Sequence, residues 1–220
     1  MHIGVQRRLV TPQPVDYGVV RSLCAALCGR YPVLRPAVIG RSVLGREIPA
    51  LLLSAGGEGQ AVLMAAAFHG QEWLTALCAL RLCEELCAAE RGRCSLCDVP
   101  VHKALRDRQI GFVPLANPDG VEIARYGSIA AGGYAASAAQ AGADIPGVWQ
   151  TNARGVDINH NFNAGWAQMQ ALAQKSGKNC GEAPESEPET RTLADLCRRV
   201  SFRHVVALHS QILPGRSLTG

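Results

Sequence analysis

Apolar and polar positions alternate along the first half of the chain with two different periods. After Asp16, which stands where an N-cap is expected, apolar residues recur at the spacing of one helix face. The apolar runs 48–53 and 61–68 predict strands, the second buried on both faces because it is apolar throughout. A helix is predicted after it, with apolar residues at four-residue steps. The positions on the two helix faces are Val20, Leu23, Cys24 and Leu27, and Leu74, Cys78, Leu82 and Leu86.

The second half continues this alternation. Residues 109–115 predict a strand that a turn closes at 117–120, and residues 204–209 predict a last strand. Ser186 and Glu189 have the spacing of a capping box, which predicts a helix after them. The Ala/Gly-rich stretch 130–143 indicates a surface loop. Helices alternating with apolar strands are typical of an α/β fold with a covered sheet.

Composition narrows the class of protein. The 220 residues suit one domain, 1–220, with 48% hydrophobic and 18% charged residues. The net charge of +4 is mild and scattered, so no nucleic-acid partner is expected, and no apolar run is long enough for a membrane span. Nine cysteines without an export signal favour reduced thiols and a cytoplasmic location.

The sharpest chemical pattern is Phe68-His69-Gly70-Gln71-Glu72-Trp73, between a buried strand and a helix. An imidazole and a carboxylate three residues apart can converge there on one metal ion, and His209 ends another apolar strand. Two histidines and one glutamate form a known catalytic zinc set. The ordinary alternatives are a helix N-terminus with a favourable Glu and a histidine at a strand end.

Together with five further sequence segments, this pattern resembles the zinc carboxypeptidase family. Within that family it resembles the bacterial branch that cleaves γ-D-glutamyl–diaminopimelate bonds of murein peptides. The similarity runs from about Tyr17 to Gln211. The blocks are 39–46 (IGRSVLGR), 68–73 (FHGQEW), 113–121 (VPLANPDGV), 152–162 (NARGVDINHNF), 186–190 (SEPET) and 208–211 (LHSQ). The resemblance implies a mixed, mostly parallel sheet covered by helices on both faces, a peptide substrate, and zinc on His69, Glu72 and His209.

The resemblance also suggests residues that bind substrate. The family's Asn-Arg pair falls on Asn159 and His160, so the Arg is replaced, and Arg154 is the nearest candidate for a carbonyl-polarising Arg. Arg grips a carboxylate with two parallel hydrogen bonds, and His does not reproduce that fork. The change therefore favours an unusual or internal amide as substrate. A solvated loop Arg is the plain alternative for Arg154.

The proton acceptor that the family uses, a Glu on a later strand, is absent after His209. We therefore expect a fold that is incomplete at its C-terminus, impaired hydrolysis, and self-association through an exposed edge strand.

Two other functional classes stay open. Cys94 and Cys97, with Cys83 and Cys87, offer a thiolate site for structural zinc, although buried cysteines often serve as small apolar residues. A relative that binds zinc or peptide without hydrolysis also fits the sequence.

Overall fold

A computed structural model describes residues 7–56, 59–176 and 179–210. Its main element is a five-stranded sheet in the order β1-β2-β6-β3-β7. The strands are β1 (Leu34–Arg41), β2 (Glu47–Ser54), β3 (Gln60–Ala66), β6 (Arg108–Val113) and β7 (Phe202–Leu208). β1 and β6 each pair with β2 in antiparallel fashion, whereas β3 pairs with β6 and β7 in parallel. The expected mixed sheet is confirmed, but its parallel pairings are half of the total and not most of it.

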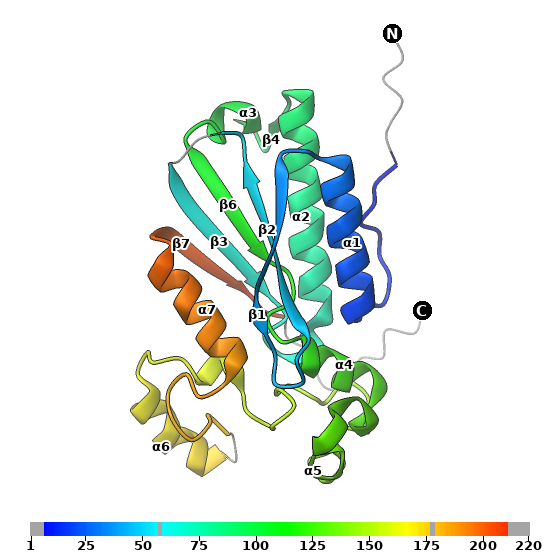
Figure 1. Cartoon of the computed structure of the whole chain (residues 1–220), viewed down its shortest axis with the longest axis vertical. Helices are drawn as coiled ribbons and strands as arrows, with labels where there is room; N and C mark the ends of the chain where they lie inside the picture. Colours follow the sequence, from blue (N-terminus) through cyan, green and yellow to red (C-terminus); the bar gives the residue numbers. More distant parts are fainter. Residues whose placement is uncertain (1–6, 57–58, 177–178, 211–220) are drawn as a thin grey trace.

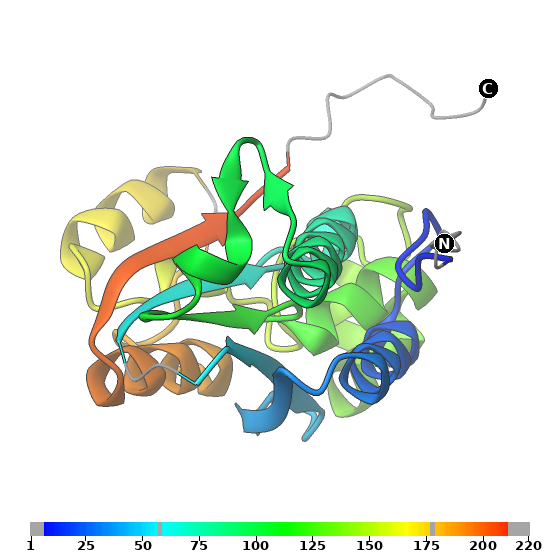
Figure 2. The same cartoon turned by 90° about the horizontal axis from the view of Figure 1, so that it is seen from above.

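Helices cover both faces of this sheet (Figures 1 and 2). α1 (Tyr17–Arg30) and α2 (Trp73–Gly92) lie side by side on one face, and α7 (Pro188–Arg199) packs on the other. The remaining elements are the hairpin β4 (Ser95–Leu96) and β5 (Val99–Pro100), the helices α3 (Val101–Ala104), α4 (Pro118–Tyr126), α5 (Ala135–Gln140) and α6 (Trp166–Ser176), and the 3-10 turns η1 (Gly70–Glu72), η2 (Ser128–Tyr134) and η3 (Ile158–His160).

The alternation of side chains along the inner strands divides the core into two layers. Leu51 and Leu53 of β2 and Phe112 of β6 join the layer under α1 and α2. Ile48, three residues before Leu51, and Val113, one residue after Phe112, join the layer under α7. All five are almost fully buried, so these strands have apolar contacts on both sides, as runs that are apolar throughout predict.

The first helix follows the sequence prediction closely, whereas the second is rotated relative to it. Asp16 accepts a hydrogen bond from the Val19 N–H and caps α1. In α2, however, Leu74 is 50% exposed, and the stripe that faces the sheet lies elsewhere on the helix. It consists of Leu77, Leu80, Cys83 and Cys87. Because α2 carries apolar residues around most of its circumference, spacing alone does not identify its buried face.

Two local predictions are wrong. Residues 130–143 are not a loop, because they contain η2 and α5, whose Ala131 and Ala138 are buried in a small core of their own. The expected capping box at Ser186 does not form either. α7 begins at Pro188 after the N-cap Glu187, and Glu189 turns away to accept a hydrogen bond from the Val43 N–H.

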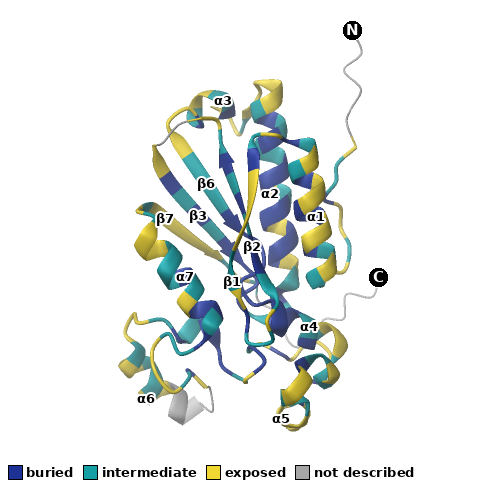
Figure 3. Ribbon diagram, viewed as in Figure 1, coloured by how far each residue is buried: buried dark blue, intermediate teal, exposed yellow. Residues whose placement is uncertain are grey.

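β7 lies at the edge of the sheet and is mostly exposed, as Figure 3 shows. Its carboxyl end lies beside that of β3, since Ala66 pairs with Leu208. Gln211, the last residue of the family resemblance, and the tail to Gly220 lie outside the described residues. Across the ranges that are described, no helix combines the length and the apolarity needed to cross a bilayer.

Candidate metal centre

The centre begins where the chain leaves β3. Ala67 adopts a left-handed conformation (φ 53°), which turns the chain sharply out of the strand. The next turn packs so closely against α4 and the loop before Asn152 that Gly70 has no room for a side chain. A Cβ there would lie 2.1 Å from the carbonyl oxygen of Gly120. Hydrogen bonds from the N–H of Gly70 and of Gln71 to the carbonyls of Gln150 and Trp149 fix the turn. The backbone that carries His69 and Glu72 is therefore held tightly.

The structure brings the three predicted ligands together. Nδ1 of His69 lies 2.9 Å from Oε1 of Glu72, and Nδ1 of His209 lies 3.0 Å from Oε2 of the same carboxylate. One donor atom from each residue falls within 4.8 Å of the other two. Glu72 is buried, His69 is half-buried and His209 is exposed, so the cluster opens to solvent on the side of His209.

A buried carboxylate behind the cluster orients His69. Oδ1 of Asp157 lies 3.2 Å from Nε2 of His69, and Oδ2 lies 2.8 Å from Nδ1 of His160. Burial disfavours the charged form of His69, but its hydrogen bonds to Asp157 and Glu72 outweigh this effect and raise the pKa of His69. Burial would likewise raise the pKa of Asp157, yet its two histidine partners lower that pKa to about 2. Asp157 is therefore an anion that can accept a hydrogen bond from Nε2 of the His69 ring.

This donor set fits zinc. The ion takes imidazole nitrogen and carboxylate oxygen, and catalytic sites leave a fourth position open. When Nε2 of His69 donates to Asp157, Nδ1 presents its lone pair to the space that Glu72 and His209 share. Among the described residues, this is the single group of three or more His, Cys, Asp or Glu side chains with donor atoms that close together.

Of the three predicted substrate residues, His160 and Arg154 have side chains that already contact other protein groups. Asn159 is half-buried, and its N–H donates to Asp157. His160 uses Nδ1 for the same carboxylate. Arg154 turns to another pair of groups: its Nη1 lies 3.6 Å from Oε2 of Glu187, and its Nε donates to the Tyr134 hydroxyl. The structure thus connects Asn159 and His160 to the centre and places the Arg154 guanidinium in a neighbouring network.

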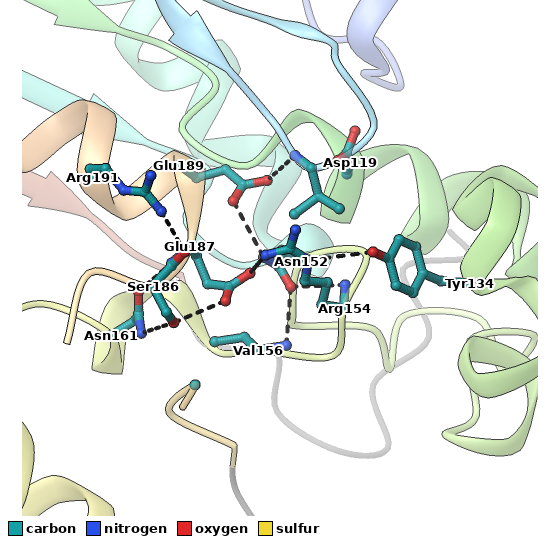
Figure 4. A network of polar contacts seen from close by, with 12 residues as sticks. Asp119, Tyr134, Asn152, Arg154, Val156, Asn161, Ser186, Glu187, Glu189 and Arg191 are labelled. Atoms are coloured by element: carbon teal, nitrogen blue, oxygen red, sulfur yellow. Dashed lines mark hydrogen bonds and ion pairs between the residues drawn. The ribbon is translucent and has the colours of Figure 1, made fainter. Parts of the chain in front are cut away.

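That neighbouring network was not predicted from the sequence (Figure 4). Asn152 donates through Nδ2 to Glu187 (2.7 Å) and to Glu189 (3.3 Å), and all three side chains are buried. A third buried carboxylate, Asp119, accepts from the Ser42 hydroxyl and pairs with Arg46. Most of these residues belong to the blocks of the family resemblance. Their contacts show that these blocks link the β1–β2 turn, α4 and α7 around the centre.

The four cysteines of the alternative thiolate site differ in burial and do not form one metal site. Cys94 and Cys97 are exposed around the β4–β5 hairpin, whereas Cys83 and Cys87 are buried in α2. A hydrogen bond with Cys87, together with burial, raises the pKa of Cys83 and keeps it a neutral thiol.

Comparisons with known proteins agree with this geometry. A family model described as zinc carboxypeptidase matches residues 20–212. The chain is 30% identical to gamma-D-glutamyl-L-diamino acid endopeptidase 1 of Lysinibacillus sphaericus, over 93% of this chain and 52% of that protein. It is also 30% identical to human carboxypeptidase B, over 80% of this chain and 40% of that protein. The chain spans about half the length of the curated relatives it matches.

The fold is shared with solved carboxypeptidases. The structure of carboxypeptidase A from Helicoverpa armigera matches with a TM-score of 0.69 and 22% identity, over 91% of this chain and 46% of that one. Thrombin activatable fibrinolysis inhibitor matches with a TM-score of 0.70 and 19% identity, over 92% and 51%.

Proposed function

Because the chain belongs to the zinc carboxypeptidase family, we propose that it is a zinc-dependent peptidase whose metal is held by His69, Glu72 and His209. The observation that carries this proposal is the meeting of these three side chains within 4.8 Å. His69 and Glu72 come from the turn that follows β3, and His209 directly follows the parallel strand β7. Zinc, when bound there, would acidify water and polarise the amide carbonyl.

We further propose that the substrate is an amide between γ-D-glutamate and a diamino acid, as in cell-wall peptides. The relative from Lysinibacillus sphaericus is named for such a bond. The residue in place of the family's Arg does not favour ordinary exopeptidase action, since Nδ1 of His160 is hydrogen-bonded to Asp157, and the Arg154 guanidinium is paired with Glu187. A protein that does not grip a terminal carboxylate with a free guanidinium suits an internal or unusual amide.

A second candidate function is binding of zinc and peptide with little hydrolysis. Amide hydrolysis needs a group that takes a proton from water and passes it to the leaving amine. Both carboxylates of the centre are already engaged, Glu72 with the two histidines and Asp157 with His69 and His160. A protein that relies on these groups alone is expected to turn over about 10²- to 10⁴-fold more slowly than one with a free base.

Two peptides with the same ends distinguish these proposals, one with a γ-D-glutamyl–diaminopimelate bond and one with an α-linked bond. The purified 220-residue chain is incubated with each, with and without added zinc, and the products are identified by mass spectrometry. Zinc-dependent cleavage of the γ-linked peptide alone supports the proposed substrate. Zinc binding without cleavage of either peptide supports the second candidate, and preference for the α-linked peptide overturns the substrate assignment.

A further inference from the structure

We propose that His160 is a positioning residue for the metal centre, which holds Asp157 so that Asp157 in turn holds His69. The proposal deepens the zinc site of the proposed function and rests on it. It assigns His160 a role other than the substrate contact that its place in the sequence suggests.

The Asp157 carboxylate has a hydrogen-bond partner at each of its two oxygens. Asp157 is 3% exposed and is the N-cap of η3. Its Oδ1 accepts from the N–H of Asn159 (3.1 Å) and faces Nε2 of His69 (3.2 Å). Its Oδ2 has one partner among the described residues, Nδ1 of His160 at 2.8 Å. Without that imidazole, a buried anionic oxygen loses its hydrogen bond, which favours a turn of the carboxylate toward water.

The Asp157 carboxylate in turn orients the His69 ring. A ring nitrogen that donates to a carboxylate fixes both the tautomer and the orientation of an imidazole, so that the other nitrogen faces the metal. Nε2 of His69 lies on Asp157, and Nδ1 lies on the side of Glu72. A change in the Asp157 rotamer therefore changes how well Nδ1 of His69 is presented.

His160 lies close enough along the chain for its ring to reach Asp157. Its side chain is 20% exposed, and it lies three residues after Asp157, at the end of the same 3-10 turn. This short separation lets the ring bend back to Oδ2. The imidazole at this position is therefore committed to the carboxylate that faces His69.

The test compares His160→Ala with Asn159→Ala, a neighbour whose contact with Asp157 comes from its backbone and survives the substitution. Zinc affinity is measured by competition with a chromophoric chelator. We expect His160→Ala to weaken zinc binding about 10- to 100-fold and Asn159→Ala to leave it within about twofold. Combining His160→Ala with Asp157→Ala should add little to Asp157→Ala alone, because the two residues act in series. Zinc affinity unchanged by His160→Ala, or full additivity in the double variant, would overturn the proposal.

A second readout needs no metal. The ¹⁵N shifts of the His69 imidazole, recorded on metal-free protein under alkaline conditions where imidazoles are neutral, report its tautomer. Without metal, Nδ1 of His69 also faces a carboxylate, Glu72 at 2.9 Å, so both tautomers compete. The protein and Asn159→Ala should show the same share of the Nε2–H tautomer, and His160→Ala should show a smaller share. If the unsubstituted protein binds no zinc, the proposed function fails while the tautomer still decides the role of His160. An unchanged tautomer in a folded His160→Ala protein would count against it.

Discussion

Nδ1 of His209 lies 3.0 Å from Oε2 of Glu72, although 137 positions separate the two residues. The parallel pairing of β3 with β7 produces this proximity, because it aligns Ala66 with Leu208. The residues that follow both strands then reach the same edge of the sheet, where α/β proteins place their sites. The geometry of the centre thus depends on sheet register as much as on the ligands.

The close packing of Gly70 predicts that the turn carrying the ligands tolerates no side chain. In Gly70→Ala the new Cβ would meet the carbonyl oxygens of Gly120 and Trp149 at 2.1 and 3.0 Å, and a backbone cannot move aside as a side chain can. We expect a loss of about 1–3 kcal/mol in the free energy of unfolding and weaker zinc binding. Urea denaturation and chelator competition measure the two effects.

Gly29→Ala is the matched control, because a Cβ at that position in α1 meets nothing within 4 Å. Alanine is the better helix former, so this variant should be as stable as the protein or slightly more stable. Equal behaviour of the two variants would show that the turn is looser than the structure indicates.

Glu189 predicts a pH-dependent stability. Burial raises its pKa from the ordinary 4.5 to about 7, so between these values the folded state binds more protons than the unfolded chain. The contribution of this group to stability is therefore present below pH 4.5 and is lost as the pH rises to 7, by at most about 3 kcal/mol. Glu189→Gln, which stays neutral, should flatten the decline in unfolding free energy over that window.

Asp195→Asn on the same helix is the control for that measurement, since it removes a carboxylate that is half exposed and lies outside the buried network around Asn152. Denaturation at a series of pH values gives the slopes. Identical slopes for Glu189→Gln and the unsubstituted protein would mean that Glu189 is ionised throughout the range.

The exposed edge of the sheet predicts self-association of the purified 220-residue chain. Val205 and Val206 of β7 are 54% and 38% exposed on a strand with a free edge among the described residues. Such an edge pairs readily with another chain. Val206→Lys should shift the sedimentation profile toward monomer, whereas Ile145→Lys, at an exposed apolar position outside the sheet, should not. A monomer at every concentration tested would refute the prediction.

Much of this architecture follows from local sequence patterns. The rest depends on tertiary packing, which these patterns do not determine. The capped helix after Asp16 and the strand before His69 are fixed by short-range chemistry, and the family blocks predict the three candidate ligands. The buried stripe of α2 is not fixed by its local sequence, because Leu74 and Leu77 are equally apolar and tertiary packing alone selects between them. Asp157 was missed as a functional residue because a carboxylate in a turn has no distinguishing spacing, although it lies inside the block 152–162.

If His69, Glu72 and His209 hold a single zinc ion, as we propose, His209→Ala and His204→Ala should differ sharply in a zinc titration. Both histidines belong to the same segment, but the side chain of His204 is not part of the cluster. We predict that His209→Ala loses zinc affinity by more than the roughly 100-fold expected for an outer partner, while His204→Ala binds like the unsubstituted protein. Equal zinc affinity in both variants would contradict the account.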